Sequence, residues 1–331
     1  MSLEGAPEWE NIAVGAHWIR TFQAGPHQAS EAVVFIHGNP GSAADFTELV
    51  TQIAPPRRAV ALDLPDFGQS IAAPGFGHTQ DEYAEFVGEA LKTLGIRRAH
   101  LVLHDVGGAI GLIWASTHTG QVASVTLINT GILAGYKWHR KARGWQTPGV
   151  GELMQAATFR SVFRRSIIKA EPHGLPRDFV DEMYDNYDRR TRRAVLDIYR
   201  DLKKVGKSAK QLIPLLSAAD LPCLVVWGAG DPYIPASFAD RQRSAFPSAE
   251  VHILPASGHW PFIDDPPAVS ELLTGSACSS RSARPVLRVT LCTPSIVASC
   301  LSIPTASRLL SSSEVPGGAI RNTVNVPSLN A

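Results

Sequence analysis

A chain of 331 residues is long enough for one large domain or two average ones. Hydrophobic residues make up 44% of it and charged residues 18%, which excludes a chain that is disordered throughout. The 31 Lys and Arg residues nearly balance the 30 Asp and Glu residues, so no global field attracts nucleic acid or an anionic membrane. We therefore expect a small neutral organic substrate, with water as co-substrate, and leave the oligomeric state open.

The start of the chain does not look like an export signal. Met1 to Ala13 contains three glutamates and has neither a basic start nor an apolar run. No stretch approaches the roughly 20 consecutive apolar residues that span a bilayer. We therefore expect a cytoplasmic protein, in which the four cysteines are free thiols because none shows a paired metal-binding spacing. They are Cys223, Cys278, Cys292 and Cys300.

Short aliphatic runs alternate with helical patterns along most of the chain, for example Gln80 to Thr93 and Gly108 to His118. This alternation predicts a mostly parallel sheet with helices on both faces. The runs are almost continuously hydrophobic, as strands buried on both faces require. The predicted strands are Ala32 to Ile36, Ala59 to Leu62, His100 to Leu103, Ser124 to Ile128, Cys223 to Trp227 and Val251 to Leu254.

The alternation breaks between about Gly135 and Ser217, where helical patterns occur without a convincing strand. A helical insertion between two strands predicts a cap over the carboxyl ends of the sheet, where open α/β sheets bind ligands. The sequence thus predicts an α/β core in two parts, 1–134 and 218–274, with a helical cap at 135–217.

The last segment, 275–331, differs in composition from the rest. It is rich in Ser, Arg, Pro, Val and Thr, and Glu314 is its single acidic residue. Neither the helix period nor the strand period fits it. We expect a disordered tail, either an out-of-frame or read-through extension that replaces the end of the final helix, or a linker.

The segment Leu103-His104-Asp105-Val106-Gly107-Gly108 lies between a predicted strand and a predicted helix. This is the position of a nucleophile elbow, a tight turn that exposes one side chain to the cleft. Gly107 supplies the small residue that the turn needs, and Asp105 stands where serine hydrolases carry serine. Taken alone, Asp105 is equally consistent with a helix N-cap.

Other loops supply partners for Asp105. Asp231 follows one predicted strand and His259 follows the next, in the order nucleophile, acid, histidine that α/β-hydrolases show. The segment His37-Gly38-Asn39-Pro40 follows the first predicted strand. It can direct the backbone N–H of Asn39, together with that of Val106, at a developing oxyanion.

In combination these motifs resemble the α/β-hydrolase superfamily, specifically its aspartate-nucleophile branch of epoxide hydrolases and haloalkane dehalogenases. The resemblance covers roughly Gly15 to Leu273. It implies an α/β-hydrolase fold in which Asp105 forms a covalent ester, His259 activates water and Asp231 orients His259. It implies no cofactor and no metal. The residues we expect in the substrate pocket are His37, His104, Trp138 and Trp260.

The group that stabilises the leaving atom separates the two halves of this branch. Haloalkane dehalogenases resemble this chain at Asn39 but place Trp directly after the nucleophile, where Val106 stands. Epoxide hydrolases use tyrosines of the cap, and Tyr199 stands at the position of one of them, although a packing role for it is equally plausible. For the second tyrosine no residue matches, and the substitutes are Tyr136, Tyr184 and Tyr187.

These residues rank three functions. We expect an epoxide hydrolase first and a haloalkane dehalogenase second. A noncatalytic binding protein with the hydrolase fold comes third, because it would carry Asp105, Asp231 and His259 together only by accident.

Overall fold

The computed structural model describes residues 5–54 and 56–275. Within them the strands form one eight-stranded sheet in the order β1-β2-β4-β3-β5-β6-β7-β8. The first two strands form an antiparallel hairpin that pairs antiparallel with β4, and the other neighbours are parallel. The strands are β1 (Glu8–Val14), β2 (His17–Ala24), β3 (Glu31–Ile36), β4 (Arg58–Leu62), β5 (Arg98–His104), β6 (Val122–Ile128), β7 (Cys223–Gly228) and β8 (Glu250–Leu254).

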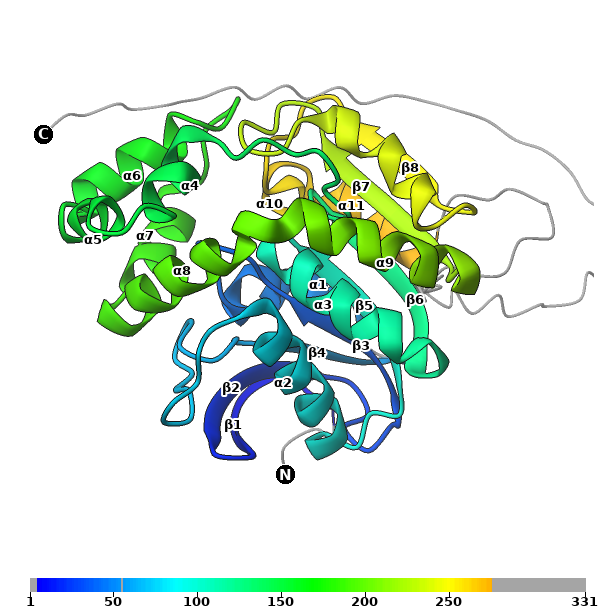
Figure 1. Cartoon of the computed structure of the whole chain (residues 1–331). Coiled ribbons are helices and arrows are strands. Elements are labelled where there is room, and N and C mark those ends of the chain that lie inside the picture. The colour runs from blue at the N-terminus through cyan, green and yellow to red at the C-terminus, as the bar shows by residue number, and fades with distance from the viewer. Residues whose placement is uncertain (1–4, 55, 276–331) are drawn as a thin grey trace, which may run out of the picture. The chain divides into compact units, whose positions relative to one another are not determined.

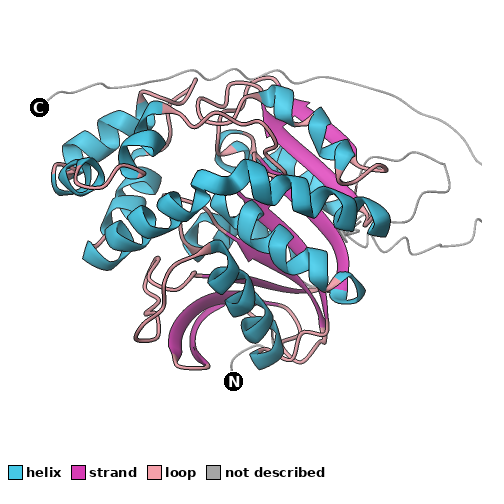
Figure 2. Ribbon diagram, in the orientation of Figure 1, coloured by secondary structure: helices cyan, strands magenta, loops and turns pink. Residues whose placement is uncertain are grey.

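Helices cover both faces of the sheet (Figures 1 and 2). α2, α3 and α9 pack side by side in front of the sheet in Figure 1, and α1 contacts α11 on the other face. The helices are α1 (Thr47–Ile53), α2 (Gln80–Thr93), α3 (Val106–Thr117), α4 (Arg140–Trp145), α5 (Val150–Ala156), α6 (Arg160–Ile168), α7 (Arg177–Asp185), α8 (Arg189–Asp201), α9 (Val205–Ala219), α10 (Pro261–Asp264) and α11 (Pro266–Thr274).

The six strands predicted from hydrophobic runs are all present, as β3 to β8, with ends that differ by a residue or two. Every residue of β4, β6 and β7 is buried, which explains why their sequences are largely hydrophobic. The predicted helix Gln80 to Thr93 is α2, which Thr79 and Glu82 start with a reciprocal capping box. The α/β-hydrolase fold is therefore confirmed.

The hairpin of β1 and β2 was not predicted. β1 lies at the edge of the sheet and is largely exposed, with charged residues at Glu8 and Glu10. Charges on an edge strand prevent pairing with other chains, but they also break the hydrophobic alternation that reveals a strand. Gly15, with φ 57°, makes the turn between the two strands.

Between β6 and β7 the chain forms helices α4 to α9 and no strand. We call residues 135–201, which include α4 to α8, the helical insertion. α9 instead packs against α3 beside the sheet, although most of it falls within the range predicted as cap. The end of the insertion therefore lies closer to Asp201 than to Ser217.

The C-terminal part of the described chain closes the fold. The Asp265 side chain accepts a hydrogen bond from the N–H of Ala268 and so caps α11, which ends at Gly275 in the left-handed conformation. Cys223 is buried as a free thiol. The other three cysteines and almost all of the predicted tail lie outside the described residues. None of the helices in the described part of the chain has the length and hydrophobicity needed to cross a membrane.

Candidate active site

Asp105 occupies a strained turn between β5 and α3. Its φ of 47° and ψ of −122° lie where non-glycine residues are rarely found. Two glycines allow this turn to pack against the loop after β3: a Cβ on Gly107 would lie 2.4 Å from the Ile36 carbonyl oxygen, and one on Gly38 would lie 2.3 Å from the Asp105 Cβ. Asp105 is at the N-cap position but makes no capping hydrogen bond, so its carboxylate faces the cavity instead.

The Asp105 carboxylate is held through one oxygen. Its Oδ2 accepts a 2.8 Å hydrogen bond from the backbone N–H of Asn39. Burial raises the pKa of Asp105, whereas His259 and the backbone N–H groups of Asn39 and Val106 counteract this by stabilising the charged form. The two N–H groups predicted to form an oxyanion hole therefore both act on the carboxylate of Asp105.

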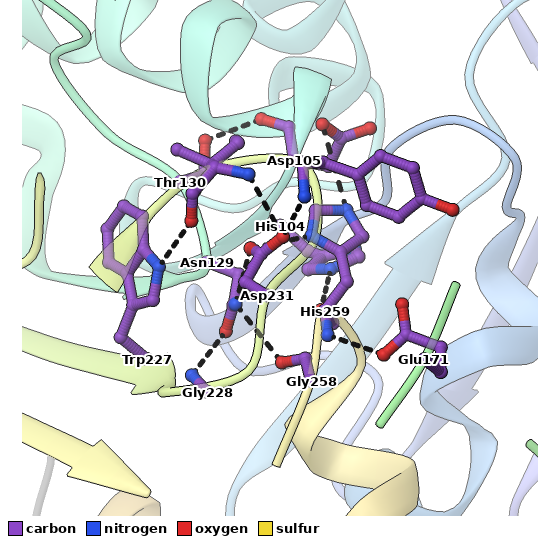
Figure 3. Close-up of polar contacts among 12 residues, drawn as sticks. His104, Asp105, Asn129, Thr130, Glu171, Trp227, Gly228, Asp231, Gly258 and His259 are labelled. Carbon is purple, nitrogen blue, oxygen red and sulfur yellow. Dashed lines mark hydrogen bonds and ion pairs between the residues drawn. The ribbon is translucent and has the colours of Figure 1, made fainter. Parts of the chain in front are cut away.

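Asp231 and His259 complete the predicted group of three (Figure 3). His259 Nδ1 lies 2.9 Å from Asp231 Oδ2, and His259 Nε2 lies 3.9 Å from Asp105 Oδ1. Burial lowers the pKa of His259, but the charges of Asp231, Asp105 and Glu171 outweigh it and raise the pKa to about 9. The histidine thus bridges two carboxylates.

Asn129 orients Asp231 and was missed by the sequence analysis. It follows β6 with φ 48°, and its Nδ2 donates to Asp231 Oδ2 at 2.7 Å and to the Gly258 carbonyl oxygen. Its Oδ1 accepts the N–H of Gly228. One side chain therefore ties together the loops after β6, β7 and β8 (Figure 3). Its place directly after a predicted strand was the available signal.

Glu171 brings a second acid to the histidine from the helical insertion. Its Oε2 accepts the backbone N–H of His259 at 2.9 Å. Burial raises the pKa of Glu171 to about 7, although His259 opposes the shift. On the same loop the N–H of Gly258 donates to Asp264. No sequence pattern points to Glu171, because the loop between α6 and α7 has no motif.

A hollow of about 650 Å³, which includes space open to solvent, lies between the sheet loops and the helical insertion. The core contributes Asn39, Asp105 and His259. The insertion contributes Trp138, Lys141, Trp145 and Tyr199, among others. Most of the remaining lining is apolar, as small-molecule sites usually are.

Of the four predicted pocket residues, Trp138 lines the cavity and the other three do not. His37 Nε2 accepts the N–H of Leu64, and burial lowers the pKa of His37 to about 4. His104 Nε2–H donates to the carbonyl oxygen of His259. Trp260 packs edge-on against the His259 ring. The prediction was wrong for these three, whose side chains contact other parts of the core and brace its loops.

The predicted tyrosines also divide into those that line the cavity and those that do not. Tyr199 is buried in the cavity wall, where burial and Asp105 raise its pKa. Tyr136 also lines the cavity, but its hydroxyl donates to the carbonyl oxygen of Tyr233. Tyr184 and Tyr187 do not line it. Tyr233, which was not predicted, lines the cavity and packs edge-on against His259.

Comparison with known proteins places this chain in a family. Residues 31–266 match the model of the alpha/beta hydrolase fold family. The chain belongs to this family and is an α/β-fold hydrolase.

The names of individual relatives describe different activities. The dihydrolipoyllysine-residue acetyltransferase component of the acetoin cleaving system of Pseudomonas putida is 29% identical over 275 residues, which are 76% of this chain and 65% of that protein. This chain thus spans just under two thirds of that relative. Haloalkane dehalogenase 2 of Mycobacterium bovis is 26% identical over 289 residues, covering 82% of this chain and 97% of the relative.

Among solved structures, the Cif epoxide hydrolase from Acinetobacter nosocomialis is similar with a TM-score of 0.72. The sequences are 16% identical, and the match covers 84% of this chain and 91% of the other. At this identity the likeness shows the fold alone.

Proposed function

We propose that this chain hydrolyses epoxides to vicinal diols through a covalent ester on Asp105. The observation that carries the proposal is the state of the Asp105 carboxylate. Its Oδ2 is held by the Asn39 N–H, while Oδ1 lies toward His259 and the cavity. A carboxylate in this position attacks a saturated carbon through Oδ1, and its Oδ2 becomes the ester carbonyl oxygen already placed against the Asn39 N–H.

Two steps follow from this arrangement. Attack by Oδ1 forms a carbon–oxygen bond and breaks one bond of the epoxide ring, leaving an alkoxide on the substrate. Water that has lost a proton to His259 then attacks the ester carbonyl carbon. The N–H groups of Asn39 and Val106 stabilise the resulting oxyanion. When it collapses, the carbon–oxygen bond to the substrate breaks and His259 returns its proton to the leaving alkoxide. The second proton of the water balances the alkoxide of the first step, so that the diol departs and Asp105 is restored as a carboxylate.

The charges of the site match the basicity of His259 to the order of these two steps. Asp105 is one of the groups that raise the pKa of His259. Esterification neutralises Asp105, so the pKa of His259 falls once the ester exists. The histidine therefore becomes a better general base at the step that needs one.

The position of Tyr199 favours an epoxide over a haloalkane as the substrate. It lines the cavity with Asp105, and its phenol lies close enough to Asn39 and Asp105 for both to affect its pKa. A phenol there donates a hydrogen bond or proton to the alkoxide, which a departing halide does not need.

A second candidate function, haloalkane dehalogenation, has its own observation. Asn39 Nδ2 and Trp138 Nε1 are buried in the cavity wall without a hydrogen-bonding partner among the described residues. Buried donors without partners are rare, and two N–H groups beside the nucleophile are able to hold a halide ion. Trp138 would then replace the indole that is missing at Val106.

Trapping the ester tests the proposal. His259→Gln removes the base but leaves Asp105, so incubation with a reactive epoxide is expected to add the substrate mass to a peptide containing Asp105. His252→Gln, which changes a histidine paired only with Glu250, is the matched control and should turn over without accumulating an adduct. An adduct on another residue, or none with any reactive epoxide, contradicts the proposal.

A further inference from the structure

Lys141 brings a positive charge into the wall of the cavity that holds Asp105. It lies on α4, and its Nζ is 3.5 Å from Ser166 Oγ and 5.2 Å from the centre of the Trp145 ring. Among the described residues no carboxylate lies within ion-pair distance of this Nζ. The cation is therefore partly removed from water without an opposite charge.

Burying the Lys141 cation without an opposite charge is energetically unfavourable. Burial lowers the pKa of Lys141 to about 8, and no acid counteracts the shift. A cation–π contact with Trp145 stabilises the cation only weakly and does not replace a counter-ion. A carboxylate of the substrate would supply the missing charge and a charge-assisted hydrogen bond.

The cavity wall connects this lysine to the reacting group. The Trp145 ring contacts Tyr199 at 4.8 Å between ring centres, and Tyr199 lies next to Asn39, whose N–H holds Asp105. Aromatic rings thus separate Lys141 from the nucleophile. A substrate that reaches both ends must carry hydrocarbon between its reacting carbon and its charge.

We infer that the cavity takes an epoxide carrying a carboxylate, with the carboxylate bound at Lys141 and the ring at Asp105. This rests on the proposed function and replaces the neutral substrate that overall composition suggested. Asp105 repels an acid group placed beside the ring, so the site favours acids whose carboxylate is separated from the epoxide by several carbons.

Binding of unreactive ligands tests the lysine without requiring turnover. We compare an alkanoate with the alkanol of equal length by calorimetry on the full chain. Wild type is expected to bind the alkanoate roughly 10- to 100-fold more tightly than Lys141→Met does, the range for a hydrogen bond to a charged group. Lys141→Arg should keep most of this affinity. Lys137→Met removes an exposed lysine nearby and is the matched control, expected to bind as wild type does.

Kinetics then connect binding with reaction. The readout is the ratio of kcat/KM for an epoxyalkanoate to that for the methyl-ended epoxide of equal length. Lys141→Met should reduce this ratio, and Lys137→Met should not.

The possible failures are distinguishable. Turnover of epoxides with no preference for acids overturns the inference and leaves the proposed function standing. Alkanoate binding that depends on Lys141, without any epoxide turnover, overturns the proposed function and the epoxide part of the inference. Equal alkanoate binding by wild type and Lys141→Met overturns the lysine site itself.

Discussion

The two walls of the cavity are built in different ways. On the core side, the polar atoms of Asp231 are fully engaged: Oδ1 accepts two backbone N–H groups, and Oδ2 contacts Asn129 and His259. On the insertion side, Trp138 Nε1 has no hydrogen-bonding partner among the described residues and Lys141 has no counter-ion there.

This difference separates reaction from selection. Saturated hydrogen bonding fixes Asp231 and His259 before substrate arrives, which is what a preorganised catalytic group requires. Unsatisfied donors on the opposite wall gain most from a ligand that pairs with them. We therefore expect changes to Asp231 and His259 to affect every substrate. Changes to unpaired donors of the cavity wall, Asn39 Nδ2 on the core side as well as Trp138 Nε1 on the insertion side, should affect some substrates and not others.

The largest effect is expected from the core wall. Asp231→Asn leaves the shape of the site intact but removes the charge that holds His259 in its tautomer, and should lower kcat by about 10⁴-fold for every substrate. Steady-state assays on an epoxide and a haloalkane measure this. Asp240→Asn changes an exposed aspartate and serves as the control. A loss confined to one substrate class would show that the core wall also selects.

Intermediate, substrate-dependent effects are expected from the insertion wall. Tyr199→Phe keeps the ring packing and should lower diol formation roughly 10- to 1000-fold, the range of a single acid or oxyanion donor. Trp138→Phe removes the N–H donor together with part of the ring, and should affect halide release more than diol formation. Assays of diol and halide on both variants compare the two functions. If Tyr199→Phe leaves diol formation unchanged while Trp138→Phe abolishes dehalogenation, dehalogenation becomes the better proposal.

Glu171 belongs to the helical insertion but binds the His259 loop of the core. Its substitution should have the smallest effect on activity. Glu171→Gln can still accept the His259 N–H, but it removes one of the charges that raise the pKa of His259. The acidic limb of the kcat–pH profile should therefore move to lower pH. An unchanged limb would mean that Glu171 braces the loop without tuning the base.

Stability gives a second measurement on the same variant. The folded state raises the pKa of Glu171 from 4.5 to about 7, so folding binds a proton across this interval and wild-type stability falls as pH rises through it. The Glu171→Gln variant does not lose stability through this group as pH rises. Urea unfolding at pH 5 and pH 8 should show a smaller difference between the two pH values for the variant than for wild type.

The sequence by itself determined the fold class and placed the three reacting groups. Largely hydrophobic runs mark β3 to β8, and β3 to β7 are buried along nearly their whole length, whereas β8 lies partly exposed at the edge of the sheet. Asp105, Asp231 and His259 each stand in a loop directly after such a run. Since the carboxyl ends of parallel strands meet at one edge of the sheet, chain order alone was enough to bring these three together.

Only the tertiary structure decided what surrounds them. Lys141 and Glu171 reach the cavity or the histidine loop from a helical insertion whose sequence has no motif, and the direction of its helices depends on packing between distant segments. His37, His104 and Trp260 are residue types common in pockets but lie behind this one, where they contact the Leu64 N–H, the His259 carbonyl oxygen and the His259 ring respectively. Local pattern specifies which residues stand at the ends of strands, whereas side-chain direction and burial depend on contacts far apart in the chain.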